Sequence, residues 1–117
     1  MKQSLLLILI LLLGGCYDLC ENTVILEEKN QENGMKAVVF DRNCGATTSL
    51  SRQVSILKEE KELPNDAGNI FTSSHYSDVQ IRWVDSTHLE ITRIGTGKDF
   101  LMEESLQGIK ISYALNE

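Results

Sequence analysis

The sequence predicts a small all-β domain that follows a short apolar leader. Nine consecutive aliphatic residues, at positions 5–13, form the leader. After residue 21, short runs that alternate apolar and polar residues are separated by turn residues, a pattern typical of strands with one packed and one wet face. No stretch there repeats apolar residues every three to four positions, as an amphipathic helix would. The 117-residue chain therefore allows one domain, at residues 22–117, with a modest core.

The leader has the dimensions of a signal peptide. A nine-residue helix rises about 14 Å, about half of a bilayer's hydrocarbon core, so it is too short to span a membrane. Lys2 supplies the positive charge that precedes the apolar region of such peptides. The alternative is a buried core helix, which does not need an apolar residue on every face. We therefore expect residues 1–15 to form a signal helix that is cleaved.

The residues after the leader carry a lipidation motif. Leu13-Gly14-Gly15-Cys16 resembles the lipobox of bacterial lipoproteins. In that family a diacylglycerol is attached to the cysteine sulfur, and a peptidase then cuts before the cysteine. The resemblance implies a mature chain that starts at a lipidated Cys16, with residues 16–21 as a tether to the membrane on the periplasmic or outer side. Tyr17 replaces the aspartate that marks inner-membrane retention in enteric bacteria, so the resemblance favours the outer membrane.

The charge excludes one class of partner. Cleavage would remove one lysine and leave ten basic against seventeen acidic residues, a net charge of −7. A chain with this charge repels nucleic-acid phosphates, so we expect no nucleic-acid partner.

Two cysteines remain beside Cys16, and export would place them in an oxidising compartment. We therefore predict a disulfide between Cys20 and Cys44, worth on the order of 3 kcal/mol by the chain-entropy model. The alternative is two free, buried cysteines. A metal site is not expected, because His75 and His88 lie far along the chain in turn-like contexts.

The first strands follow from turn chemistry. Residues 23–27 and 35–40 flank a polar turn that ends in Asn33-Gly34, the strongest hairpin dipeptide. A loop of small residues follows Cys44. Residues 52–58 then alternate again and predict a third strand, and residues 70–72 form a short fourth candidate.

The second half of the domain also consists of short alternating segments separated by turns. Residues 78–84 place Val79, Ile81 and Trp83 on one face, and residues 88–94 mirror them after a tight turn. A brief extended piece at 100–102 precedes the last strand, at 108–115. Together these segments predict a mostly antiparallel sheet of about six or seven strands. The spacing leaves open whether this sheet is curled or forms a small sandwich.

A second resemblance covers most of this domain. From Lys36 to Tyr113, and most clearly in the string CGATT at Cys44–Thr48, the chain is similar to a family of small uncharacterised bacterial proteins, many of them lipoproteins. The resemblance implies a single domain. The family has no agreed activity to carry over.

The loop after the second predicted strand is the best candidate binding site. It gathers an acid, a base, a flexible backbone and hydroxyl groups beside the predicted disulfide: Asp41, Arg42, Gly45, Thr47 and Thr48. Such a loop can recognise a sugar, a peptide or a protein. The alternative is that these residues satisfy turn geometry and cap backbone groups around a structural disulfide.

The sequence offers no convergent catalytic set. Ser73, Ser74, His75 and Asp78 lie within six positions, where side chains do not generally converge as a triad. Residues 95–99 lack the first glycine and the hydroxyl residue of a phosphate-binding loop. We therefore expect no enzyme activity and no cofactor.

The expected function is that of a membrane-anchored envelope lipoprotein that binds another envelope component. The alternative is an acidic inhibitor or immunity-type module that covers a basic effector, which the charge of the body favours.

Overall fold

The computed structural model describes residues 19–45, 50–74 and 77–116, and all regular structure in them is β-strand. The predicted all-β class is confirmed. Within these residues no helix is long and apolar enough to cross a bilayer. The predicted signal helix and the lipidation site lie outside the described residues. The strands are β1 (Glu21–Asn30), β2 (Met35–Asn43), β3 (Ser51–Lys58), β4 (Phe71–Ser74), β5 (Asp78–Asp85), β6 (His88–Ile94), β7 (Asp99–Met102), β8 (Ser105–Leu106) and β9 (Ile109–Asn116).

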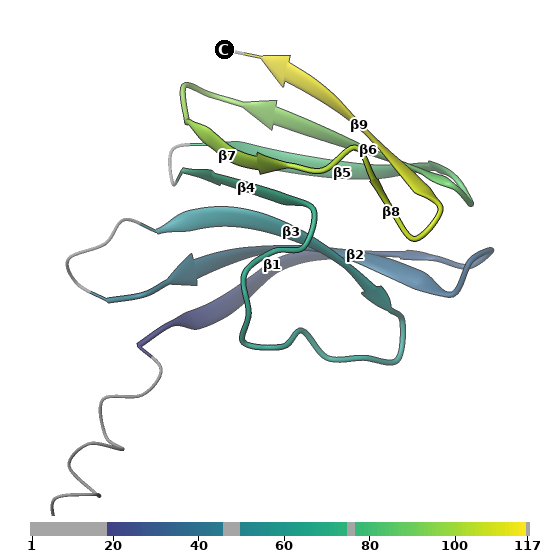
Figure 1. The fold of residues 1–117 in the computed structure, drawn as a ribbon, viewed down its shortest axis with the longest axis horizontal. Coiled ribbons are helices and arrows are strands. Elements are labelled where there is room, and N and C mark those ends of the chain that lie inside the picture. The colour runs from purple at the N-terminus through teal and green to yellow at the C-terminus, as the bar shows by residue number, and fades with distance from the viewer. Residues whose placement is uncertain (1–18, 46–49, 75–76, 117) are drawn as a thin grey trace, which may run out of the picture.

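The strands form two sheets (Figure 1). One has five strands in the order β1-β2-β3-β4-β7, and the other has four in the order β5-β6-β9-β8. Of the two arrangements that the sequence left open, a curled sheet or a small sandwich, the two-sheet sandwich is the one observed. The described residues form nine strands rather than about six or seven. The short pieces predicted at 70–72 and 100–102 correspond to the four-residue strands β4 and β7, whereas β8, whose two residues are too few to produce an alternating pattern, was not predicted.

One strand pair departs from the expected antiparallel arrangement. β6 and β9 run parallel, with Leu89 opposite Ile111 and Ile91 opposite Tyr113. After β6 the chain crosses to the other sheet as β7, returns through β8, and enters β9 in the same direction as β6. Parallel pairing needs such a crossover connection, whereas a tight hairpin always produces antiparallel strands.

The core lies between the two sheets. The alternating residues of β5 contribute side chains to this core as predicted. Val79 and Ile81 are buried, whereas Gln80 and Arg82, which alternate with them, are exposed. Trp83 packs against the core from its edge. The fully or nearly buried core residues are Ala37, Val39, Val54, Ile56, Ile70, Phe71, Val79, Ile81, Leu89, Ile91, Ile109 and Ile111.

The five-stranded sheet is also covered on its outer face. Val38 and Phe40 alternate with the core residues of β2 and therefore point away from the second sheet, yet both are fully buried. The segment between β3 and β4, residues 59–70, lies on this side of the sheet (Figure 1). It is held by the Gly68 amide, which donates to Gln53 Oε1 at 2.6 Å, and by Asn69 Nδ2, which donates to the Ile56 carbonyl at 2.9 Å.

Gly68 shows how closely this segment approaches the sheet. A Cβ at this position would lie 2.8 Å from the Val54 carbonyl oxygen and 2.9 Å from that of Phe71. No side chain fits there without a backbone shift. The close approach closes the outer layer and positions residues 63–66 over the outer face of the sheet at the start of β1.

Cys20 and Cys44 form the predicted disulfide. They lie one step beyond the first residue pair of the β1–β2 ladder, Glu21 with Asn43, so the bond extends this ladder covalently. The start of the domain is therefore fixed to the end of β2.

Candidate functional site

Asp41 and Arg42 of the predicted binding loop do not face a common ligand. Asp41 accepts two hydrogen bonds from Arg52, at 2.7 Å from Nε and 3.1 Å from Nη2. Arg52 also lies 3.8 Å from Asp78 of the second sheet, so this cluster closes one end of the core. The hydrogen bond to Asp41 raises the pKa of Arg52, which stabilises its charged form.

Arg42 points to the opposite face of the sheet, as strand alternation requires. Its Nη1 donates to Asn22 Oδ1 at 2.9 Å and to Asn65 Oδ1 at 3.0 Å. Asp41 and Arg42 therefore belong to two different networks, and a ligand cannot contact both side chains from one side of the sheet.

The start of the loop has the geometry of a turn. The Gly45 amide donates to Asn43 Oδ1 at 3.1 Å, and Gly45 has a φ of 124°, a conformation that favours glycine. Thr47 and Thr48 lie outside the described residues. The turn interpretation accounts for Gly45, and the binding role of the two threonines stays a prediction.

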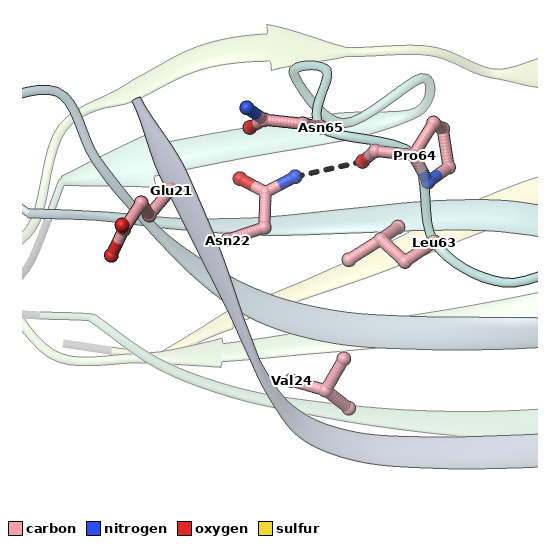
Figure 2. Close-up of a pocket in the computed structure, with 6 residues that line it drawn as sticks. All are labelled: Glu21, Asn22, Val24, Leu63, Pro64 and Asn65. Carbon is pink, nitrogen blue, oxygen red and sulfur yellow. Dashed lines mark hydrogen bonds between the residues drawn. The ribbon is translucent and has the colours of Figure 1, made fainter. Parts of the chain in front are cut away.

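A hollow lies next to this loop, between β1 and the β3–β4 segment. It has a volume of about 330 Å³ and combines polar and apolar walls. Figure 2 shows Asn22 of β1 pointing toward Pro64 of the β3–β4 segment, with Val24 farther along the strand. The lining residues are Glu21, Asn22, Val24, Leu63, Pro64 and Asn65.

Asparagine side chains fix the walls of the hollow. Asn22 Nδ2 donates to the Pro64 carbonyl at 3.0 Å and to the Asp66 carbonyl at 2.9 Å, and Figure 2 shows the first of these bonds. Asn65 Nδ2 donates to the Cys20 carbonyl at 2.9 Å. Together with Arg42, these bonds tie the start of β1, the end of β2 and the β3–β4 segment into one unit.

This site could not be found from the sequence. Asn22 and Pro64 are 42 positions apart, and no periodicity connects a strand start with a distant loop. The only local signal is the turn-rich composition of residues 64–69, which predicts bends and not their contacts.

A second, smaller hollow of about 240 Å³ lies at the other end of the sandwich, between the β1–β2 and β5–β6 hairpins. The hairpins are linked by three side-chain donors. Trp83 Nε1 donates to the Glu28 carbonyl at 2.9 Å, and Asn30 Nδ2 donates to the Asp85 carbonyl at 3.0 Å. Asn33 Nδ2 donates to the Ser86 carbonyl at 2.9 Å. These polar groups hold the hairpins together.

The hydroxyl residues near β4 form a structural network. Ser73 Oγ lies 2.8 Å from Asp99 Oδ1 and 2.9 Å from Ser77 Oγ, and Asp99 is paired with Arg93. In this arrangement the Asp99 carboxylate is paired with the buried guanidinium of Arg93. His75 lies outside the described residues. Within the described part of the chain, no group of three or more metal-ligating side chains is present.

Comparison of the chain with protein-family models, with curated proteins and with solved structures finds no match.

Proposed function

We propose that this protein is a membrane-anchored envelope lipoprotein that acts by binding another envelope component and not by catalysis. The observation that carries the proposal is the Leu13–Cys16 motif, which begins with the last of nine consecutive aliphatic residues. The Cys20–Cys44 disulfide supports it, because cysteines pair stably in compartments outside the reducing cytoplasm.

Two acyl chains on Cys16 would hold the domain at the membrane. A single chain binds membranes reversibly, whereas two chains give stable attachment at about 0.8 kcal/mol for each buried CH₂. Cys16 is five residues from the start of β1 at Glu21. Five extended residues span at most about 18 Å, so the disulfide end of the domain would stay close to the bilayer surface.

The test is the mass of the protein purified from the membranes of a bacterial host that exports it. The expected chain lacks residues 1–15 and is heavier than the bare polypeptide by one or more lipids on Cys16. A Cys16→Ser variant should lose the lipid and leave the membrane fraction. A chain that retains residues 1–15, or whose mass equals that of an unmodified polypeptide, contradicts the proposal. Separation of inner and outer membranes then tests the location that Tyr17 favours.

A second candidate function is that of an acidic inhibitor or immunity-type module. The net charge of −7 favours it, since such modules cover the basic surface of an effector protein. Tight binding to a cationic protein that weakens steeply with added salt would support this function. Binding that is insensitive to salt would contradict it.

A further inference from the structure

We propose that the N-terminal half of β1, residues 21–25, is a docking edge for an extended, cationic segment of a partner protein, which adds to the five-stranded sheet as a sixth strand. The inference adds detail to the proposed binding role. It rests on the proposed function in one respect, that the partner is an envelope component. β1 is the terminal strand of its sheet, and none of the described strands pairs with its outer edge. Such an edge offers backbone donors and acceptors to an incoming strand.

Only the first half of this edge is open. In the second half, Trp83 Nε1 donates to the Glu28 carbonyl, and the side chain of Asn30 donates to the Asp85 carbonyl, so the second sheet is tied to β1 there. A bulge between Val24 and Leu26 separates the two halves. An added strand would therefore pair with residues 21–25 and end at the bulge.

Apolar side chains are exposed along the open half. Val24 is 47% and Ile25 is 50% exposed, although both lie on a strand of a well-packed sheet. Val24 also lines the hollow together with Leu63 and Pro64. A strand added beside β1 would direct alternate side chains to this face, and one apolar side chain could enter the hollow.

The charge around this edge decides the chemistry of the partner. β1 and residues 59–70 together carry seven acidic and two basic residues, and two of the acidic ones are already paired within the domain, Glu27 with Lys36 and Glu59 with Lys29. The acidic ones are Glu21, Glu27, Glu28, Glu59, Glu60, Glu62 and Asp66, and the basic ones are Lys29 and Lys61. Lysine or arginine side chains on the incoming strand would face the carboxylates near the open half, Glu21 of β1 and the acidic residues of the 59–70 segment. A second copy of β1 would bring its own acidic residues against them, so the charge disfavours self-pairing.

The docking edge is already held in place. The Cys20–Cys44 disulfide fixes the start of β1, and Asn22 and Asn65 fix the wall of the hollow. A rigid site loses little conformational entropy when a ligand binds.

The test uses the purified chain as its exporting host processes it, and a fluorescent heptapeptide of alternating lysine and valine. We expect saturable binding that weakens with salt, with amide chemical-shift changes concentrated at residues 21–25. The matched probe is the same peptide with an N-methyl group on every backbone amide, which removes the donors of both strand edges without changing its charge. We expect the affinity of this probe to be lower by about tenfold or more, because several backbone hydrogen bonds are lost.

Charge-reversal variants locate the site. Glu21→Lys and Glu62→Lys should each weaken peptide binding about threefold, the effect of one exposed charge pair. The matched control is Glu104→Lys, which makes the same change at an exposed position beyond β7 and should leave binding unchanged. Amide spectra of each variant establish that it remains folded.

Three results would overturn the inference: equal binding of the N-methylated peptide, an equal effect of Glu104→Lys, or a concentration-dependent dimer through β1 in sedimentation. Its failure is distinguishable from failure of the proposed function. A lipidated protein that does not bind the peptide refutes the docking edge alone. An unlipidated protein that binds the peptide through β1 refutes the membrane anchor alone.

Discussion

The guanidinium of Arg93 lies against the carboxylate of Asp99 inside the sandwich, with Nε 3.0 Å from Oδ1. The two side chains are 7% and 13% exposed. Arg93 also donates to the Gly95 carbonyl at 2.6 Å, and Asp99 accepts from Ser73. Because Arg93 belongs to β6 and Asp99 to β7, this ion pair connects the four-stranded sheet to the five-stranded sheet.

Replacement of one partner of this pair should destabilise the domain strongly. Asp99→Asn or Arg93→Met leaves a buried polar group or charge without its partner, and we expect a loss of about 3–5 kcal/mol in the free energy of unfolding. The double variant Arg93→Met with Asp99→Leu should lose less than either single variant, because no charge remains buried. Urea unfolding of the four proteins measures this. Single variants that lose less than about 1 kcal/mol would show that the pair is effectively solvated.

The disulfide should stabilise the domain through its effect on the unfolded chain. Cys20 and Cys44 are 24 positions apart, and closing a loop of this length is worth on the order of 3 kcal/mol. The variant Cys20→Ser with Cys44→Ser should remain folded and unfold at a lower urea concentration. Added reductant should lower the stability of the wild-type protein and leave this variant unchanged. A wild-type protein that does not respond to the reductant would contradict the prediction.

Asn22 should control the order of the β3–β4 segment. Asn22→Ala removes the donors to the Pro64 and Asp66 carbonyls and the acceptor for Arg42, so we expect a loss of about 1–2 kcal/mol and faster amide exchange in residues 59–69. The matched control is Asn33→Ala, which removes a similar donor at the opposite end of the sandwich. It should leave exchange in residues 59–69 unchanged. Equal acceleration in both variants would indicate global destabilisation.

The strands that the sequence predicted are those whose signals are local. Asn33-Gly34 closes the β1–β2 hairpin, and residues 78–94 form the predicted second hairpin, because alternation and turn chemistry act over a few residues. The partner of β9 could not be predicted in this way. Its parallel pairing with β6 depends on the path of the chain between the sheets.

The alternating pattern also did not predict that β2 is buried on both faces. Val38 and Phe40 belong to a continuous apolar run, and such runs are typical of strands covered on two sides. The layer that covers them is a polar segment whose composition predicts only a loop. For the same reason the sequence placed the candidate site on the loop after β2, while the hollow is formed by residues about 40 positions apart.

Tyr113 should make the stability of the domain decrease at alkaline pH. Its hydroxyl donates to the Glu103 carbonyl at 2.6 Å, and the Ile70 carbonyl oxygen lies 3.2 Å from the same hydroxyl oxygen. Burial raises the pKa of Tyr113 above its ordinary value, and the nearby carboxylates of Glu103, Glu104 and Asp99 raise it further. The folded protein therefore keeps the phenol proton at a pH where the unfolded chain releases it.

The sign of the effect follows from this difference in bound protons. Above the ordinary tyrosine pKa, about 10, the unfolded state binds fewer protons than the folded state, so the free energy of unfolding falls as pH rises. Tyr113→Phe removes this dependence, although it should also cost about 1 kcal/mol at neutral pH through the lost hydrogen bonds. Urea unfolding between about pH 9 and pH 11 should therefore show a steeper decline for the wild type than for the variant. In a parallel titration of tyrosinate absorbance, a phenol that ionises well above the ordinary tyrosine pKa should be missing from the Tyr113→Phe protein. Identical declines in stability for the two proteins would contradict the raised pKa.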